Sequence, residues 1–266
     1  MDETGFGFAK GALARSGDEF LCLPFEVKDD FDLGAVLGAS PAPTKRHEAV
    51  RNALLVELLL LSWRDQERWL AYSRDRNFYP TFKRYFGSSA TYAKVLWAVE
   101  SLIGARLVEH RKSRPSPKGR YRSTLRATIK LVELSPVSEL SQFRNVIAEP
   151  VRLKDADRQL MQYPSSSETR LWRRDAHEQN EALRGLSISF EFPGWTADGH
   201  GLLHNDARVL NLAHHQCYRV FNRDWEHGGR WFGTWWQGLG SNERASIRIN
   251  GEASVEIDYD YLRRRC

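Results

Sequence analysis

The sequence predicts an α+β fold in which a helical, basic region is followed by a smaller α+β region. Three observations predict it. Residues 45–62 are apolar on nearly every side, as expected for a helix in the middle of a small bundle. Residues 89–103 have apolar side chains at helical spacing, and two strand-like segments follow them. Apolar and polar residues alternate from 186 to 192, and Asn250-Gly251 is a hairpin signal.

The composition is that of an ordered protein with one large domain or two of ordinary size. The chain has 266 residues, of which 41% are hydrophobic and 27% are charged. Its three Cys residues form an odd set without CxxC spacing, which indicates free thiols in a reducing compartment. The N-terminal sequence lacks a secretory signal, and the longest apolar run, residues 53–61, is too short to span a membrane. We therefore expect a cytoplasmic protein without a membrane partner.

The first helix has a clear beginning and a less clear continuation. Thr44 is a suitable N-cap for residues 45–62, although no Glu follows at the third helical position. Residues 63–71 are expected to continue this helix or to form a second one. We predict four segments along the chain: 1–43, a loosely ordered arm and linker; 44–134, the main domain; 135–167, a connector; and 168–266, an α+β region with a C-terminal hairpin.

Positive charge is concentrated between residues 88 and 131. This stretch contains ten Lys or Arg against Glu100 and Glu109, a balance of +8. The whole chain is only +5, so the remaining residues together are −3. A local excess of this kind favours a polyanionic partner.

The elements in this stretch have a recognisable order. A helix over 89–103 begins at Ser88 or Ser89 and ends at Gly104, where a left-handed C-cap is expected. Strands are predicted at 106–112 and 121–131, with a Pro- and Gly-containing loop between them. Helix, Gly, strand, basic loop and strand is the order of a winged helix.

This order resembles winged helix-turn-helix DNA-binding domains and predicts binding to double-stranded DNA. In such domains a helix reads base edges in the major groove and the wing contacts phosphates. The helix side with Thr91, Lys94, Trp97 and Ala98 is predicted to face bases. An alternative is a solvated basic hairpin in a protein-interaction winged helix. The predicted phosphate contacts are Arg111, Lys112, Arg114, Lys118, Arg120, Arg122 and Arg126.

The second half begins with a polar helix and ends in a hairpin. The helix is predicted over 167–183 with Gly185 as its cap, before the alternating strand at 186–192. The hairpin joins residues 245–250 to residues 253–259. A three-residue loop, 250–252, is preferred over a two-residue turn. The three-residue loop places four branched apolar side chains on one face: Ile247, Ile249, Val255 and Ile257.

Short motifs between residues 215 and 262 carry a second resemblance. They are Gly228-Gly229-Arg230-Trp231, Trp235-Trp236-Gln237, Asn250-Gly251-Glu252 and Ile257-Asp258-Tyr259. The segment resembles the region that contains the first palm motif of family A DNA polymerases. It is also similar to uncharacterised phage- and plasmid-type proteins with the same motif series.

The polymerase resemblance implies roles for three residues. Asp258 stands where these polymerases place a carboxylate that binds Mg²⁺, and Arg230 and Gln237 are implied contacts to nucleic acid or nucleotide. Two-metal chemistry needs a further carboxylate on a second strand, and only eight residues follow Asp258. We therefore expect an incomplete palm-like region without catalytic activity. A metal-dependent nucleotidyltransferase or nuclease centred on Asp258 is the alternative.

Two other groups of residues admit a functional and a structural interpretation. The loop from 195 to 217 contains His200, His204, His214, His215 and Cys217, which are zinc-binding residue types, but solvated loop side chains are preferred. The tryptophans Trp225, Trp231, Trp235 and Trp236, with Arg223 and Arg230, either stack single-stranded bases or form a core, and a core is preferred. The sequence has no phosphate-binding loop, dinucleotide fingerprint or nucleophile elbow.

Together these patterns predict a DNA-binding protein of a mobile element, of the plasmid or phage replication and maintenance type. Duplex DNA is the expected partner, and single-stranded DNA and a homodimer are left open. The alternative is a winged-helix transcription regulator that dimerises through its C-terminal region. Footprinting on a palindromic site would favour the regulator, and binding to single strands or primed junctions would favour the replication protein.

Overall fold

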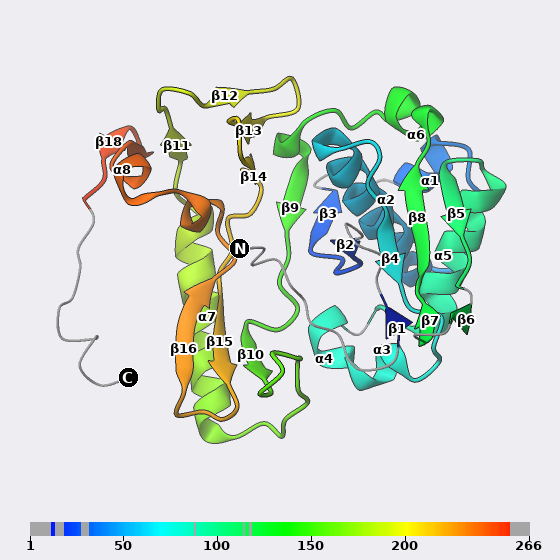
Figure 1. Cartoon of the computed structure of the whole chain (residues 1–266), viewed down its shortest axis with the longest axis horizontal. Helices are drawn as coiled ribbons and strands as arrows, with labels where there is room; N and C mark the ends of the chain where they lie inside the picture. Colours follow the sequence, from blue (N-terminus) through cyan, green and yellow to red (C-terminus); the bar gives the residue numbers. More distant parts are fainter. Residues whose placement is uncertain are drawn as a thin grey trace. The chain divides into compact units, whose positions relative to one another are not determined.

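The protein is a mixed α+β chain that divides into two compact units, residues 1–149 and residues 150–266. Figure 1 shows the computed structural model, which describes residues 12–13, 19–27, 32–87, 89–113, 115–116 and 119–255. We refer to residues 1–149 as unit 1 and to residues 150–266 as unit 2.

Unit 1 is built around the helix α2 (Lys45–Arg64). Thr44 caps it as predicted, because the Thr44 side chain accepts a hydrogen bond from the backbone N–H of His47. Leucines on all sides of α2 are buried, and the helices α1 (Leu33–Val36), α5 (Tyr92–Gly104) and α6 (Ile129–Leu134) pack against it. The central position expected from its apolar sequence is confirmed.

A four-stranded sheet also lies against α2. Its order is β2 (Glu19–Phe20), β4 (Leu70–Tyr72), β8 (Ser123–Ala127) and β5 (Val108–Arg111). Only the β2–β4 pair is parallel. The short helices α3 (Phe78–Thr81) and α4 (Lys83–Phe86) connect β4 to α5. Two smaller sheets contain β3 (Phe25–Val27) with β9 (Phe143–Asn145), and β1 (Ala12–Leu13) with β7 (Gly119–Tyr121) and β6 (Pro115–Ser116).

Several predictions for unit 1 are wrong because tertiary packing overrides local pattern. Residues 63–71 do not form a second helix, since the chain leaves α2 at Arg64 and enters β4. The N-cap of α5 is Thr91 and not Ser88 or Ser89. The left-handed residue after α5 is Arg106, with φ of 59°, and not Gly104.

The described part of residues 1–43 also differs from the loosely ordered arm that was predicted. Leu21, Phe25, Leu33 and Leu37 are buried in unit 1. Asp32 caps α1 and binds the fully buried guanidinium of Arg51 with two oxygens, at 2.6 and 2.8 Å. The segment is therefore part of the core because its spaced apolar side chains are covered by α2.

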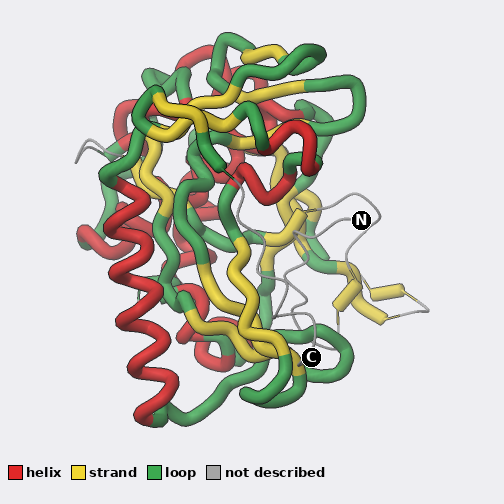
Figure 2. The backbone as a smooth tube through the Cα atoms, turned by 90° about the vertical axis from the view of Figure 1, so that its left-hand side faces the viewer, coloured by secondary structure: helices red, strands yellow, loops and turns green. Residues whose placement is uncertain are grey.

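In unit 2 a long helix covers one face of a three-stranded sheet. The helix is α7 (Ser167–Arg184), which Ser166 caps. The strands are β10 (Val151–Lys154), β15 (Tyr218–Asn222) and β16 (Gly228–Phe232), in that order. In Figure 1 α7 lies behind β15 and β16, and Figure 2 shows it on one side of these strands. A bulge interrupts the β15–β16 pair, where Gly228 and Gly229 have φ of 98° and 76°.

The rest of unit 2 consists of short strands around a second core. One sheet contains β11 (Ile188–Phe190), β17 (Ile247–Ile249) and β18 (Glu252–Ala253), and another contains β12 (Thr196–Ala197), β13 (Leu202–His204) and β14 (Val209–Asn211). The core contains Phe190, Leu203, Trp235, Leu239 and Ile247. The remaining helical turns are η1 (Leu140–Gln142), η2 (Trp235–Gly238) and α8 (Ser241–Arg244).

The hairpin near the C-terminus has the shorter of the two turns that the sequence allows. Ile249 pairs with Glu252, so the turn contains only Asn250 and Gly251, and the predicted three-residue loop is wrong. Both turn residues have positive φ, 54° and 83°, which suits the right-handed twist of the strands. Among the described residues, no helix is long and apolar enough to cross a membrane.

Candidate nucleic-acid interface

A polar network lies where β4 and β5 end beside α5. The hydroxyl of Tyr72 accepts a hydrogen bond from Nη1 of Arg74 at 3.2 Å and lies 3.0 Å from Nε2 of His110. β4 and β5 are both hydrogen-bonded to β8, so the ends of these strands meet at one edge of unit 1. Burial raises the pKa of Tyr72, and the nearby Arg74 opposes that rise.

Two further cations, Arg76 and Lys112, lie near this network, which already contains Arg74. The guanidinium carbon of Arg76 lies 6.0 Å from the ring centroid of Tyr92 in the first turn of α5. Burial lowers the pKa of His110, and the positive charges of Arg74 and Lys112 lower it further. Arg74, Arg76, Tyr92, His110 and Lys112 are called the α5 patch below.

The α5 patch is positive and open to solvent. Arg76 and Lys112 are exposed, and the other three residues are half-buried. Glu100 is the acidic group that acts electrostatically on both Tyr72 and Arg74. Asp75 lies between Arg74 and Arg76 in the sequence, so three cations stand against two carboxylates. The remaining excess of positive charge attracts phosphate groups.

The helix side that was predicted to face bases is only partly exposed. Thr91 is exposed and Lys94 is half-buried, but Ala98 is fully buried. Trp97 packs against α2, where its ring lies 5.1 Å from the ring of His47 and 5.0 Å from the guanidinium of Arg51. The prediction is therefore wrong for Trp97 and Ala98, because α2 covers their side of α5.

Two of the predicted phosphate contacts lie over Trp69, which precedes β4. The guanidinium carbons of Arg111 and Arg126 lie 3.6 and 4.9 Å from the ring centroid of Trp69. Arg126 also forms ion pairs with Glu67 and with Glu109, at 2.9 Å from the latter. Its charge is neutralised within unit 1, so Arg126 is not part of the surface proposed below.

Of the other predicted wing contacts, the structure describes the side chain of Arg122 but not those of Arg114, Lys118 and Arg120. Arg122 is only 7% exposed, and its guanidinium carbon lies 5.1 Å from the ring of Phe78. Burial lowers its pKa to about 10. A buried guanidinium cannot contact a phosphate on the surface, so the prediction for Arg122 is wrong. Arg114 and Lys118 lie outside the described residues, as does the side chain of Arg120.

Sequence reasoning missed Arg74 and Arg76. They belong to the tripeptide Arg-Asp-Arg that follows the buried strand β4, and β4 itself was not predicted. Strands that end at the same edge bring their following residues together, so recognising β4 would have drawn attention to both arginines.

In unit 2 the predicted contacts Arg230 and Gln237 are both exposed. Arg230 lies on β16, and the amide of Gln237 donates to the carbonyl of Trp231 at 2.8 Å. Trp235 is buried in the core and Trp236 packs against it, so these two tryptophans do not form a stacking platform. Asp258 lies outside the described residues.

The histidines of unit 2 do not converge on one point. Nε2 of His204 lies 2.7 Å from Oδ2 of Asp198, and the ring of His215 lies 6.3 Å from that of Trp236. Within the part of the chain that the structure describes, no group of three or more His, Cys, Asp or Glu residues is arranged to hold a metal ion.

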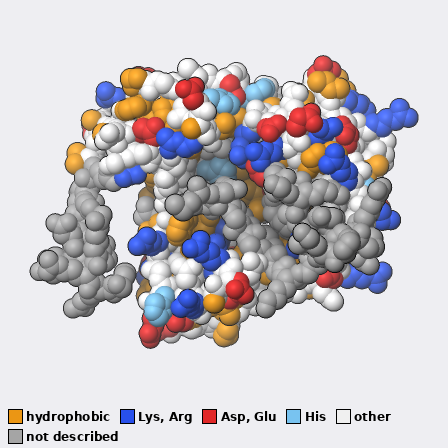
Figure 3. Space-filling model, viewed as in Figure 1, with side chains coloured by type: hydrophobic (Ala, Val, Ile, Leu, Met, Phe, Trp, Pro, Cys, Tyr) orange, Lys and Arg blue, Asp and Glu red, His pale blue; other side chains and the backbone are white. Residues whose placement is uncertain are grey.

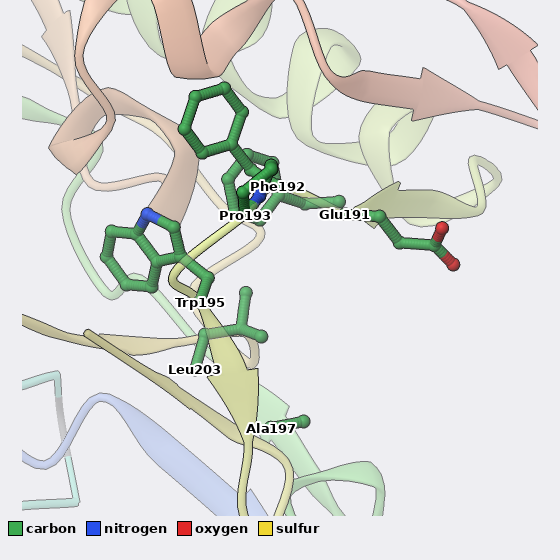
Figure 4. Close-up of a pocket in the computed structure, with 7 residues that line it drawn as sticks. Glu191, Phe192, Pro193, Trp195, Ala197 and Leu203 are labelled. Atoms are coloured by element: carbon green, nitrogen blue, oxygen red, sulfur yellow. The ribbon is translucent and has the colours of Figure 1, made fainter.

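Unit 2 also has an open apolar pocket of about 560 Å³ beside the second core. Figure 4 shows the side chains of Phe192, Trp195 and Leu203 along it, and the carboxylate of Glu191 points away from Trp195. Among the described residues that line the pocket, there is no acid–base pair, so the pocket offers apolar contact without chemistry of its own.

The chain matches no family model, no curated protein and no solved structure.

Proposed function

We propose that this protein binds double-stranded DNA through unit 1, which acts as a winged helix. The order of elements supports the proposal: α3, α4 and α5 precede the β5–β8 hairpin, whose loop is rich in Lys and Arg. β4 pairs with β8, so the hairpin is held in a sheet against α2. α5 then lies beside the hairpin, as a helix that enters a groove must do when a wing contacts the backbone.

The observation that carries the proposal is the α5 patch. Arg74 and Arg76 follow β4, and Lys112 follows β5. Arg76 lies over Tyr92 in the first turn of α5, and Arg74 and Lys112 both act electrostatically on His110. Cations on one side of a helix provide sequence-independent affinity for phosphates, and their neutralisation releases counterions from DNA. The exposed residues of α5 are Ala93, Glu100, Ile103 and Gly104. Any base contact from its first half therefore involves Ala93 and the half-buried Tyr92, Lys94 and Leu96.

The test is the salt dependence of duplex binding by the full chain. Fluorescence anisotropy with a labelled 20-base-pair duplex would compare the wild type with an Arg76→Gln, Lys112→Gln double variant. Each phosphate contact contributes about −0.9 to the slope of log K against log salt concentration, so the double variant should flatten the slope by about 1.8. Both side chains are exposed, and the fold should tolerate their replacement.

Arg126→Gln is the matched control for the charge change. Arg126 is paired with Glu67 and Glu109, so its replacement should leave the slope unchanged. An equal effect of Arg126→Gln and of the double variant would overturn the assignment of the α5 patch. The mobile-element setting, the replication role and the alternative regulator role remain predictions.

A further inference from the structure

We propose that the face of the β10–β15–β16 sheet opposite α7 is a second binding surface, and that its ligand is single-stranded nucleic acid. This surface belongs to unit 2 and involves none of the residues of the α5 patch. It would give the chain separate sites for duplex and for single strands.

Ring contacts assign each side chain to a face of the sheet. The ring of Trp172 on α7 stacks on Phe221 with centroids 4.6 Å apart, so Phe221 faces α7. The guanidinium of Arg219 lies 5.2 Å from Phe221 and 5.6 Å from Trp231, which places both on the same face. Side chains alternate along a strand, so the intervening residues point to the opposite face. The face opposite α7 therefore contains residues of different exposure. Arg152 and Val220 are buried, Lys154, Tyr218 and Phe232 are half-buried, and Arg230 is exposed.

Contacts on the face opposite α7 support this assignment independently. The ring of Phe232 stacks on Tyr218 with centroids 6.4 Å apart and an interplanar angle of 26°. The guanidinium carbon of Arg152 lies 3.4 Å from the centroid of Tyr218. A stacked row of Arg152, Tyr218 and Phe232 therefore crosses all three strands. Within this row Arg152 is buried and supports the ring of Tyr218, while the half-buried rings reach the surface. Tyr218 and Phe232 are half-buried, so each keeps part of its ring surface accessible.

The charge of the sheet has one sign. The strands β10, β15 and β16 contain four cations and no Asp or Glu. Arg219 faces α7 and Arg152 is buried, so Lys154 and Arg230 are the cations that this surface offers to a ligand. The pKa of Lys154 is lowered by burial and then by the positive charges of Arg152 and Arg158. Such mutual repulsion between cations is relieved when an anion binds. Figure 3 shows Lys and Arg side chains over β15 and β16 on the face that is turned to the viewer.

Asp175 of α7 acts electrostatically on Arg219 on the covered face of the sheet, and Asp155, Asp224 and Glu226 lie in the turns that follow β10 and β15. Asp224 lies in the β15–β16 turn, where its Oδ1 is 2.7 Å from Nδ1 of His227. Asp155 follows β10, and its Oδ1 accepts hydrogen bonds from the backbone N–H groups of Asp157 and Gln159. Both acids are engaged with their own turns, so the centre of the sheet remains cationic.

Rings and cations together favour single-stranded nucleic acid over an acidic polypeptide. A cationic groove tracks the phosphates of a single strand, while bases stack on aromatic side chains irrespective of sequence. Stacking requires bases that are free of a duplex, and a flat sheet can present rings to successive bases. An acidic peptide would use the cations but would gain little from the exposed ring surfaces.

The test separates the contribution of the rings from that of the charges. Anisotropy of a labelled dT20 oligonucleotide would be measured with the full chain, with dextran sulfate as a competitor that carries charge but no bases. The Tyr218→Leu variant should bind dT20 about tenfold more weakly, equivalent to about 1.4 kcal/mol, because one stacking partner is lost. Tyr218→Phe keeps the ring and should bind like the wild type, which also controls for a folding defect.

Charge variants complete the test. Lys154→Gln with Arg230→Gln should flatten the salt slope of dT20 binding by about 1.4, since each phosphate of a single strand contributes about 0.7. Arg170→Gln changes an exposed cation on α7, behind the sheet, and should have no effect. The proposal would be overturned if Tyr218→Leu bound dT20 as tightly as the wild type. It would also be overturned if dextran sulfate competed as well as unlabelled dT20 per unit charge, because the surface would then recognise charge alone. The Arg76→Gln, Lys112→Gln variant should retain dT20 binding, so failure of either proposal is distinguishable from failure of the other.

Discussion

Glu57 gives unit 1 a dependence on pH that can be measured directly. It lies in the middle of α2, where its two oxygens accept hydrogen bonds from the backbone N–H groups of Cys22 and Leu23, at 2.8 and 2.9 Å. These bonds hold the segment between β2 and β3, in which Leu23 has φ of 51°. Burial outweighs the two hydrogen bonds and raises the pKa of Glu57 from 4.5 to about 8.

The sign of the effect follows from the raised pKa. Between pH 4.5 and pH 8 the folded chain keeps a proton on Glu57 that the unfolded chain releases. This contribution to stability is therefore complete below pH 4.5 and is lost as the pH rises through about 8. The difference between the two pKa values corresponds to at most about 5 kcal/mol, at about 1.4 kcal/mol for each pH unit. Glu57 is partly exposed, so we expect a loss of about 2 kcal/mol between pH 5 and pH 8.

Glu57→Gln removes the titration and keeps the shape of the side chain. The amide keeps the carbonyl acceptor but has an NH2 group where the neutral acid has a hydroxyl oxygen that can accept. One backbone N–H therefore loses its partner, at a cost of about 1–3 kcal/mol. We therefore expect the variant to be less stable than the wild type at pH 5 and to approach or exceed it at pH 8.

Urea denaturation at pH 5, 6.5 and 8 would measure this difference, because the other titrating groups are common to both proteins. Carbon-13 NMR titration of the Glu57 carboxyl provides the direct check. Parallel stability profiles for the two proteins, or an NMR pKa near 4.5, would refute the reasoning.

Two further substitutions test the packing of each unit. Gly34→Ala should destabilise unit 1 by at least about 2 kcal/mol, although Ala favours helices, because the new Cβ would lie 2.2 Å from Nε of the buried Arg51. Gly104→Ala is the helical control with nothing within 4 Å of the new Cβ, and equal urea midpoints for the two variants would contradict the clash. Asn180→Leu should cost about 2–4 kcal/mol, because the buried Asn180 amide bonds both the N–H and the carbonyl of Cys217, at 2.7 and 2.9 Å. If urea denaturation shows that the free energy of unfolding of unit 2 changes by less than about 0.5 kcal/mol, water replaces the hydrogen bonds of the amide and the prediction is wrong.

Elements with a strong local signal could be predicted from the sequence. The helix α2 begins at the residue after Thr44 because a cap and an apolar run act within a few residues of each other. The same holds for α7, which spans Ser167–Arg184 and ends before Gly185. The Asn250-Gly251 turn was found for the same reason, although its length depended on the pairing of the two strands.

Short elements could not be predicted because their stability comes from distant partners. β4 has only three residues, and its hydrogen bonds go to β2 and β8, which are separated from it by tens of residues in the sequence. The stretch before it is rich in Trp and charged residues and has no strand periodicity. β4 therefore exists because of the sheet in which it lies.

By itself, the sequence determined the α+β class, the central helix of unit 1 and the local excess of positive charge, since these follow from composition and from contacts within a few residues. Only the tertiary structure decided which cations face solvent. Lys112 is exposed and Arg122 is buried, although both flank the same loop and have the same formal charge. Arg122 packs against the ring of Phe78 in α3, which lies far earlier in the sequence, and no local pattern encodes the position of such a distant group.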